Sequence, residues 1–282
     1  MSYLIEKVTR NEEVLQGDIF KIINSDNELF LTGEEFVFII TADCDIANNK
    51  MGNYYSVLPI ISTELYLKNY WVKDFFKKEF KKILDGLVSR LNKSEDIKSR
   101  KYDPLTSQSL GVWLKEDSLV EIVKVLNLKE SFKNIDDVEK KLLVIKNSVD
   151  IDCYIDYRKI SGAKDEGIKK DIIAAIKNCR EEFYFIPQIS KKGSLGSIIK
   201  LREIRPVHKN KLFLDETSER LSSSTANNVV RVCRLSDNLR YSISQTFALL
   251  FSRIGLPSEF EENKGESIAM LSEDIMRKFN DV

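Results

Sequence analysis

Residues able to do chemistry gather at one point of the N-terminal region, Asp43-Cys44-Asp45. The thiol of Cys44 suggests a nucleophile, and two carboxylates spaced i and i+2 suggest ligands for a hard cation. Negative charge beside a thiol disfavours the thiolate, so a catalytic Cys44 needs a base or a cation brought close in space. The alternative is a structural or partner-contacting turn, in which one aspartate fixes the turn and the cysteine is a small apolar side chain.

His208 is the only histidine of the chain and the candidate for that base, since imidazole is the usual general base near neutral pH. A single histidine excludes chemistry that needs two, such as a histidine-rich zinc site. The alternative is a solvated histidine in a loop. If the protein is an enzyme, the predicted catalytic residues are Asp43, Cys44, Asp45 and His208.

A second candidate site is basic. Apolar residues recur at three- and four-residue steps over residues 63–101, which predicts a long amphipathic helix with lysines on its other face. The predicted nucleic-acid contacts are on this face and in a later loop: Lys77, Lys78, Lys81, Lys82, Lys191 and Lys192. The aromatic residues of the helix lie at core spacing and not where they could stack on bases, so a solvated helix face is the alternative.

Strands must position the Asp43 segment. The unbroken apolar run at residues 36–41 predicts a strand buried on both faces. Further strands are predicted at residues 14–23 and 54–61, with a short one at 28–32. Strand, turn and strand at this spacing indicate a small antiparallel barrel or meander.

The rest of the chain mixes helices and strands. Strands are predicted at 182–187, 197–204 and 229–235 and considered at 110–114 and 152–157, helices at 117–126, 136–148, 166–181, 236–254 and 266–279, and a turn at 206–211. These elements predict an α+β fold. Its expected parts are a β core from residues 1–62 and 182–235, a helical insertion at 63–181, and C-terminal helices at 236–282.

The composition is that of an ordinary globular protein, with 43% hydrophobic and 31% charged residues among 282. Lys+Arg and Asp+Glu both number 44, so no overall charge indicates nucleic acid or a membrane. The four cysteines form no CxxC pair, and no phosphate-binding glycine loop, GxSxG or HExxH motif is present. Because no signal peptide and no long apolar stretch are found, we expect a cytoplasmic protein without a membrane span. No cofactor and no metal are expected.

The N-terminal strands resemble those of the MazF/PemK-type plasmid-maintenance toxins, which are RNA endonucleases with an SH3-like barrel. The matching stretches are Leu15-Gln16-Gly17-Asp18-Ile19-Phe20, Val37-Phe38-Ile39-Ile40-Thr41 and Val57-Leu58-Pro59-Ile60-Ile61-Ser62-Thr63. The resemblance implies a small SH3-like antiparallel barrel and places the family's catalytic Thr or Ser at Thr63 or Ser62. The family's catalytic arginine has no counterpart in residues 41–44.

A second resemblance joins the two ends of the chain. The first part is a Thr-x-x-Cys-Asp-Ile turn at residues 41–46, and the second is a C-terminal Arg-x-x-Arg-Leu-Ser helix that starts at residue 231 and ends in Phe251-Ser252-Arg253-Ile254-Gly255-Leu256-Pro257. Both are similar to uncharacterised bacterial proteins of mobile-element and phage-defence genes. This similarity spans residues 14–61 and 182–260 and implies no particular chemistry.

Together, the residues and the resemblances predict a component of a bacterial anti-phage defence or toxin-like system that binds a protein or nucleic-acid partner. The expected partner is a protein encoded by a neighbouring gene, a phage component or a nucleic acid. The alternatives are an RNase or other nuclease derived from a MazF/PemK-like barrel, and a hydrolase that depends on Cys44. The sequence does not specify the oligomeric state.

Overall fold

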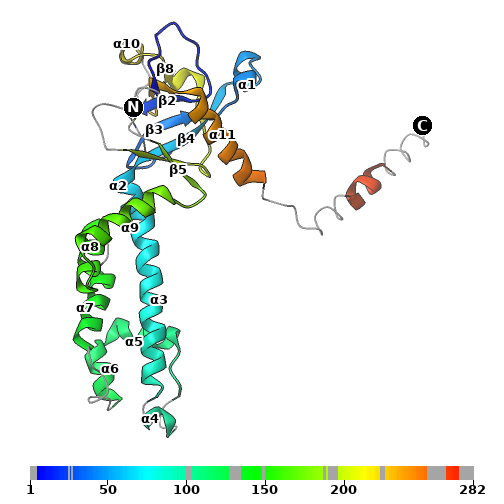
Figure 1. Ribbon diagram of the computed structural model, residues 1–282. Coiled ribbons are helices and arrows are strands. Elements are labelled where there is room, and N and C mark those ends of the chain that lie inside the picture. Colours follow the sequence, from blue (N-terminus) through cyan, green and yellow to red (C-terminus); the bar gives the residue numbers. More distant parts are fainter. Residues whose placement is uncertain are drawn as a thin grey trace.

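The protein is a curled, mostly antiparallel β-sheet from which a long helical arm projects (Figure 1). The computed structural model describes residues 5–24, 26, 28–93, 95–99, 103–126, 135–147, 150–186, 189, 196–222, 226–252 and 265–272. The predicted α+β class is confirmed. None of the helices in these ranges is both long enough and apolar enough to cross a bilayer.

The described strands are β1 (Ile5–Glu6), β2 (Asp18–Ile22), β3 (Glu34–Ile39), β4 (Tyr54–Ser62), β5 (Phe183–Ile186), β6 (Ser197–Lys200), β7 (Arg205–His208), β8 (Leu212–Phe213) and β9 (Val229–Leu235). The described helices are α1 (Asp43–Ala47), α2 (Thr63–Tyr66), the π-helical η1 (Leu67–Trp71), α3 (Val72–Leu91), α4 (Glu95–Lys98), α5 (Ser107–Glu116), α6 (Leu119–Val125), α7 (Ile135–Lys146), α8 (Ile151–Ile160), α9 (Asp165–Lys177), the 3-10 turn η2 (Lys209–Lys211), α10 (Glu216–Arg220) and α11 (Asp237–Ser252). Residues 265–272 are also helical.

The strands follow the order β1-β9-β2-β3-β4-β6-β5 across the sheet, with β8 added in parallel to β9. β4 is the longest strand and bridges two partners, since its first half pairs with β7 and its second half with β6. The sheet thus combines segments from both ends of the sequence, and the arm occupies the interval between β4 and β5.

The apolar run in β3 is buried on both faces, as predicted. Phe38 packs with Leu58 in the core beneath α11, whereas Val37 and Ile39 face a second core on the other side of the sheet. All three β3 side chains have no exposed surface. The sheet therefore curls around one apolar core while α11 covers the other.

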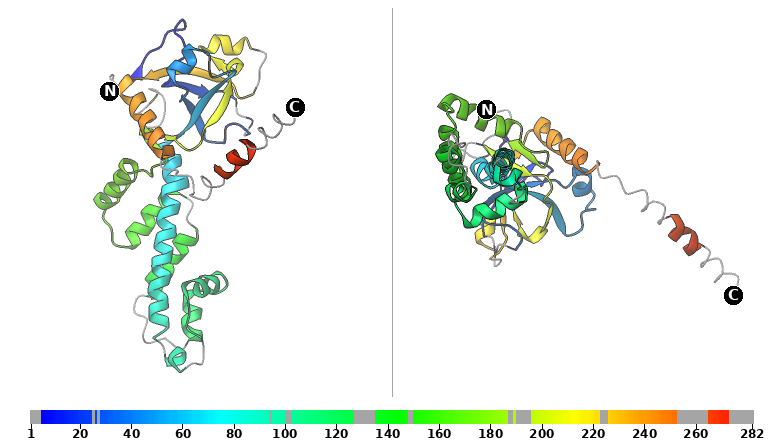
Figure 2. Two further views of the ribbon diagram at one scale, coloured as in Figure 1. Left: turned by 90° about the vertical axis from the view of Figure 1, so that its right-hand side faces the viewer. Right: turned by 90° about the horizontal axis from the view of Figure 1, so that it is seen from below.

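In the arm, α3 runs along the whole length and the remaining helices pack beside it (Figures 1 and 2). Its first turns join an aromatic cluster with α8, in which Tyr154 and Tyr157 meet Phe76. Its last turns form a separate apolar core with α5, α6 and α7, centred on residues such as Leu84 and Leu110.

Two segments considered as strands are helices. Residues 110–114 lie in α5, because Thr106 and Ser109 form a capping box and Leu110 and Leu114 face the core one turn apart. Residues 152–157 lie in α8, whose first turn is capped by Asp150. Local β propensity is overruled there by capping and by burial against α3.

Smaller corrections concern the sheet and the arm. Residues 28–32 contain no strand, because the Asp26 carboxylate accepts the backbone N–H groups of residues 28 and 29 and bends the chain. The predicted turn at 206–211 is strand β7 followed by η2. The predicted helix over 63–101 ends at Leu91.

Candidate functional site

Asp43 begins the short helix α1 directly after β3 and is held from two sides. Its Oδ1 accepts the Gln16 backbone N–H at 2.7 Å, and its Oδ2 accepts Arg240 NH1 at 2.9 Å. Arg240 is buried on α11 and also donates to the Gln16 carbonyl at 3.1 Å. The Asp43 carboxylate therefore joins the entry to β2, the start of α1 and the last sheet-covering helix, which is a structural task.

Cys44 and Asp45 occupy the outer side of the same helix. The Cys44 side chain is exposed, and its Sγ lies 3.8 Å from Asp45 Oδ1. The Cys44 carbonyl accepts the Asn48 side-chain amide at 2.7 Å, which closes the helix. The predicted thiol is accessible, and its polar neighbour is a carboxylate instead of a base.

His208 lies at the end of β7, opposite Tyr54 of β4. Its ring meets the Tyr54 ring edge-on at 5.0 Å, and its Nδ1 accepts the Asn210 backbone N–H at 3.2 Å. No hydrogen bond of the described residues joins His208 to Cys44. The two segments meet next to these residues, where Lys209 Nζ donates to Asn49 Oδ1 at 2.6 Å.

The structure adds no further ligands to Asp43 and Asp45 that would support a metal site among the described residues. In the described part of the chain, no group of three or more His, Cys, Asp or Glu side chains is arranged to hold a metal ion. The Asp43 carboxylate is already occupied by Gln16 and Arg240. The arrangement favours an acidic, thiol-bearing surface turn over a cation site.

The positions suggested by the toxin resemblance also have local structural roles. Ser62 caps α2, its Oγ accepting the Leu65 N–H at 3.1 Å. Thr63 is buried, and its Oγ1 has no hydrogen-bond partner among the described residues. In the described part of the chain, neither hydroxyl forms a hydrogen bond with the Asp43 turn.

A buried cluster around Asp18 was not predicted from sequence. Asp18 has no exposed surface and accepts Arg234 Nε at 2.6 Å and Arg231 NH1 at 3.4 Å. The two guanidinium groups also donate to the carbonyl of Glu13, at 2.8 and 3.2 Å. The sequence signal for this cluster is the pair of arginines inside the apolar strand β9, because buried charges need partners.

A second buried cluster joins Glu34 of β3 to Lys200 of β6 and Arg205 of β7. Glu34 Oε1 accepts Lys200 Nζ at 2.7 Å and Arg205 NH2 at 2.9 Å, and Glu203 contacts both cations. Burial disfavours the Lys200 charge, but the hydrogen bonds to Glu203 and Glu34 outweigh it and raise the pKa of Lys200. Two carboxylates balance two cations, so the cluster is neutral.

The predicted basic contacts on α3 are exposed, and we call Lys77, Lys78, Lys81 and Lys82 the lysine face. Among the described residues, only Lys82 of these four has a carboxylate partner, Glu79 at 3.7 Å. Lys191 and Lys192, the other two predicted contacts, lie outside the described residues.

The acidic residues of α3 are engaged by other parts of the arm. Asp74 pairs with Arg180 at 3.0 Å, Glu79 accepts the Tyr157 hydroxyl at 2.7 Å, and Asp85 accepts the Ser107 hydroxyl at 2.5 Å. These contacts orient the carboxylates towards neighbouring helices. The outer surface of α3 is consequently dominated by ammonium groups.

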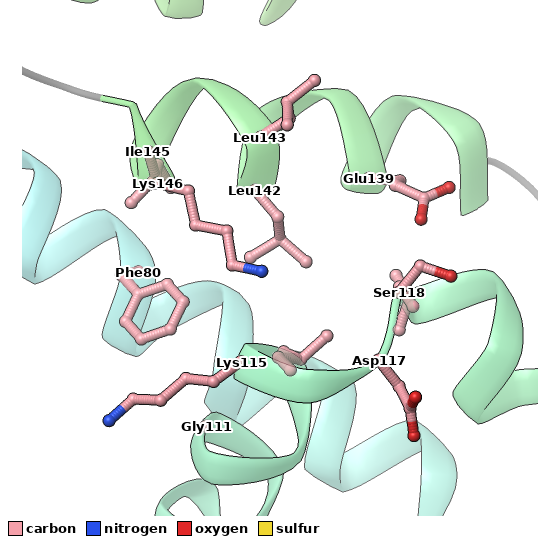
Figure 3. Close-up of a pocket in the computed structure, with 12 residues that line it drawn as sticks. Phe80, Gly111, Lys115, Asp117, Ser118, Glu139, Leu142, Leu143, Ile145 and Lys146 are labelled. Atoms are coloured by element: carbon pink, nitrogen blue, oxygen red, sulfur yellow. The ribbon is translucent and has the colours of Figure 1, made fainter.

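Two hollows flank α3. One, of about 430 Å³, lies where the arm meets the sheet and is lined by Lys78 and by two arginines, Arg158 and Arg180, each paired with an aspartate. The other, of about 380 Å³, lies further along the arm between α3, α5 and α7 (Figure 3). It is lined mostly by apolar side chains, together with Lys115, Asp117, Glu139 and Lys146.

The fold and these surfaces define an α+β protein with a curled sheet closed by buried ion pairs and a helical arm with one basic face. No protein-family model, curated protein or solved structure matches the chain.

Proposed function

We propose that this protein is a non-enzymatic component of a bacterial defence or toxin-like system, and that it binds the backbone of a nucleic acid through the lysine face of α3. The observation that carries the proposal is the contrast along this helix. Its carboxylates are used inside the arm, whereas Lys77, Lys78 and Lys81 are exposed without a carboxylate partner among the described residues. Exposed lysines attract phosphates and, on binding them, release the cations condensed around the nucleic acid.

The spacing of the lysines suits an extended polyanion. Lys77 and Lys81, like Lys78 and Lys82, are four residues apart, so each pair lies on neighbouring turns with Cβ atoms about 5–6 Å apart. The two pairs form adjacent rows on one side of a rigid helix. This surface fits a chain of phosphates better than a single small anion.

The aromatic residues of the arm indicate which part of the nucleic acid is contacted. Phe75 and Phe76 pack against Tyr157 at ring distances of 5.7 and 5.5 Å, and Trp71 packs against Tyr154 at 4.5 Å. Rings committed to the arm core do not provide a base-stacking platform. We therefore propose backbone contacts with little sequence preference.

The place in a defence or toxin-like system rests on the two resemblances, and the resemblance to MazF/PemK-type toxins also supports an SH3-like relationship for the curled sheet. The roles of Ser62 as a helix cap and of Thr63 as a buried residue favour binding over the cleavage performed by MazF/PemK-type toxins. The absence of an arginine from residues 41–44 supports the same choice. A neighbouring gene product remains the proposed protein partner of the Asp43-Cys44-Asp45 turn.

The test is binding of labelled DNA and RNA oligonucleotides, both single- and double-stranded, to the full chain across a salt series. We expect affinity to fall with salt, and the double variant Lys77→Glu/Lys81→Glu to reduce the magnitude of the salt slope by about one for each phosphate that is no longer neutralised. The matched control is Lys169→Glu/Lys170→Glu, which removes two exposed lysines from α9. No binding at low salt, or an equal weakening in both variants, would refute the proposal.

A further inference from the structure

The helix at residues 265–272 is separated from the rest of the protein (Figures 1 and 2). Every one of its residues is exposed, including Ile268 at 58% and Leu271 at 60%. A helix of this length is marginal in water without tertiary contacts, because nucleation costs more than a few hydrogen bonds return. Its apolar side chains therefore need a surface to cover them.

The arm offers an apolar groove, defined here as the hollow between α3, α5 and α7 (Figure 3). Phe80, Leu114 and Leu142 line it, and Leu143 at its edge is 59% exposed. Figure 3 shows Lys115 and Lys146 on the side of Phe80, and Asp117 and Glu139 on the opposite side. The groove thus has apolar walls, with two lysines on one side and two carboxylates on the other.

The C-terminal segment has the pattern that a helix-binding groove requires. Ile268 and Leu271 are three residues apart, and Ile275 continues the spacing at i+7 in the sequence. Residues 259–274 contain six carboxylates and one lysine, whereas residues 277 and 278 are basic. Carboxylates therefore lie on both sides of the apolar pair, at Glu266 before it and at Glu273 and Asp274 after it, and they complement the lysines of the groove.

α7 rises from the far end of the arm towards α8, so Lys146, its last residue, lies at the end of the groove nearer the sheet (Figure 1).

The connection is 12 residues long, from Ser252 to Gly265, and a chain of that length spans at most about 40 Å. Phe80 is the ninth residue of α3, which places it about 12 Å along that helix from the sheet end. The groove thus begins close to the sheet end of the arm, and the length of the connection is compatible with docking within one molecule.

We propose that the C-terminal helix around Ile268 and Leu271 docks into the apolar groove of its own arm. The acidic side of the helix faces Lys115 and Lys146, and the apolar stripe covers Phe80, Leu142 and Leu143. Docking removes from water two apolar surfaces that are otherwise both exposed.

Hydrogen–deuterium exchange of the full chain tests this arrangement. In the wild type, amides of residues 265–272 should exchange about tenfold more slowly, or slower still, than in Leu143→Glu, which places a charge at the edge of the groove. Leu271→Glu should in turn speed exchange on α7. Because both side chains are largely exposed, the variants should fold, and thermal unfolding checks that they do.

The matched control is Ile173→Glu, which adds the same charge at a 51% exposed apolar position on α9, outside the groove. It should leave exchange at residues 265–272 unchanged. Unprotected amides in the wild type, protection that survives Leu143→Glu, or an equal decrease in the control would overturn the proposal. Protection that disappears on dilution would also overturn it, because the groove would then hold the helix of a second copy.

Discussion

Arg234 and Asp18 form an ion pair in the interior, with Arg234 Nε donating to Asp18 Oδ1 across 2.6 Å. The pair joins β9 to β2 although 216 residues separate the two in sequence. Arg240 and Asp43 repeat the arrangement between α11 and α1 at 2.9 Å. Charged contacts therefore join the N-terminal strands to the C-terminal strand and helix, which precede and follow the inserted arm in the sequence. These contacts use residues of both segments of the second resemblance.

Removing the Asp18 carboxylate should be strongly destabilising. Asp18→Ala leaves two buried arginines without their shared anion, and breaking a buried pair from one side costs about 3–5 kcal/mol. Urea unfolding of the variant should show this decrease in the free energy of unfolding. Glu216→Ala removes half of an exposed i,i+4 pair with Arg220 and should change it by less than about 0.5 kcal/mol. Equal effects of the two changes would contradict the role given to Asp18.

Gly17 should tolerate no side chain. It has a φ of 94°, and an added Cβ would lie 2.9 Å from both Cβ and Cδ of Arg240. Gly17→Ala should therefore cost backbone strain of about 1–3 kcal/mol and also displace the arginine that holds Asp43. Gly52→Ala, at φ 64° with open space around it, carries the strain alone. Thermal unfolding should show the larger decrease in Tm for Gly17→Ala, and similar decreases would mean that the Arg240 contact is unimportant.

Much of the sheet is predictable because its signals are local. The apolar run in β3 and the alternation in β9 predict strands that the structure contains, and Gly and Asp punctuate them where expected. The strands considered at 110–114 and 152–157 are wrong because the deciding contacts are distant: Leu110 packs on α3, and Tyr157 bonds to Glu79. Long-range burial overrides short-range propensity in such segments.

In the candidate site, too, local features can be predicted from the sequence and long-range contacts cannot. The accessibility of Cys44 and of the lysine face follows from helical periodicity and turn position, which a sequence can reveal. The partners of Asp43 are a backbone amide 27 residues earlier and a guanidinium 197 residues later. No local pattern encodes that meeting, so a carboxylate that resembles a catalytic group from sequence has a structural role in the fold.

Stability at alkaline pH should depend on Lys200. Its pKa is raised above the ordinary value of 10.5, because hydrogen bonds to Glu203 and Glu34 outweigh the effect of burial. A raised folded-state pKa means that its stabilisation is complete below the unfolded value and is lost as pH rises through the folded value. The excess unfolding free energy of wild type over Lys200→Met should therefore shrink above about pH 10.5.

The comparison with Lys200→Met is necessary because other groups titrate in the same pH range. Burial, with hydrogen bonds to Asp171 and Glu79, also raises the pKa of the Tyr154 and Tyr157 hydroxyls, so both destabilise the fold as pH rises. Urea unfolding should be measured for the two proteins at the same alkaline pH values. The difference between their unfolding free energies then cancels the contributions of Tyr154 and Tyr157. A wild-type excess that stays constant with pH would contradict the role of Lys200.

Thiol labelling should distinguish the predicted nucleophile from the other cysteines. Cys44 is exposed, whereas Cys233 is buried in the sheet, and burial together with the Asp18 charge raises the pKa of its thiol to about 12. Burial also raises the pKa of the Cys179 thiol. A thiol reagent at mildly alkaline pH should therefore react first with Cys44, and Cys44→Ser should remove the fastest phase, because reaction requires an accessible thiolate.

The same measurement tests whether Cys44 and His208 act as a catalytic pair. His208 Nδ1 already accepts from the Asn210 N–H, and its ring rests on Tyr54, so His208→Ala should leave the Cys44 labelling rate unchanged. A pair of the kind used by cysteine hydrolases would instead lose thiolate when the histidine is removed, and labelling would slow. Asp45→Asn serves as the control, since it changes the group 3.8 Å from Sγ and leaves His208 in place. A slower rate in His208→Ala but not in Asp45→Asn would favour the hydrolase over a binding role for this turn.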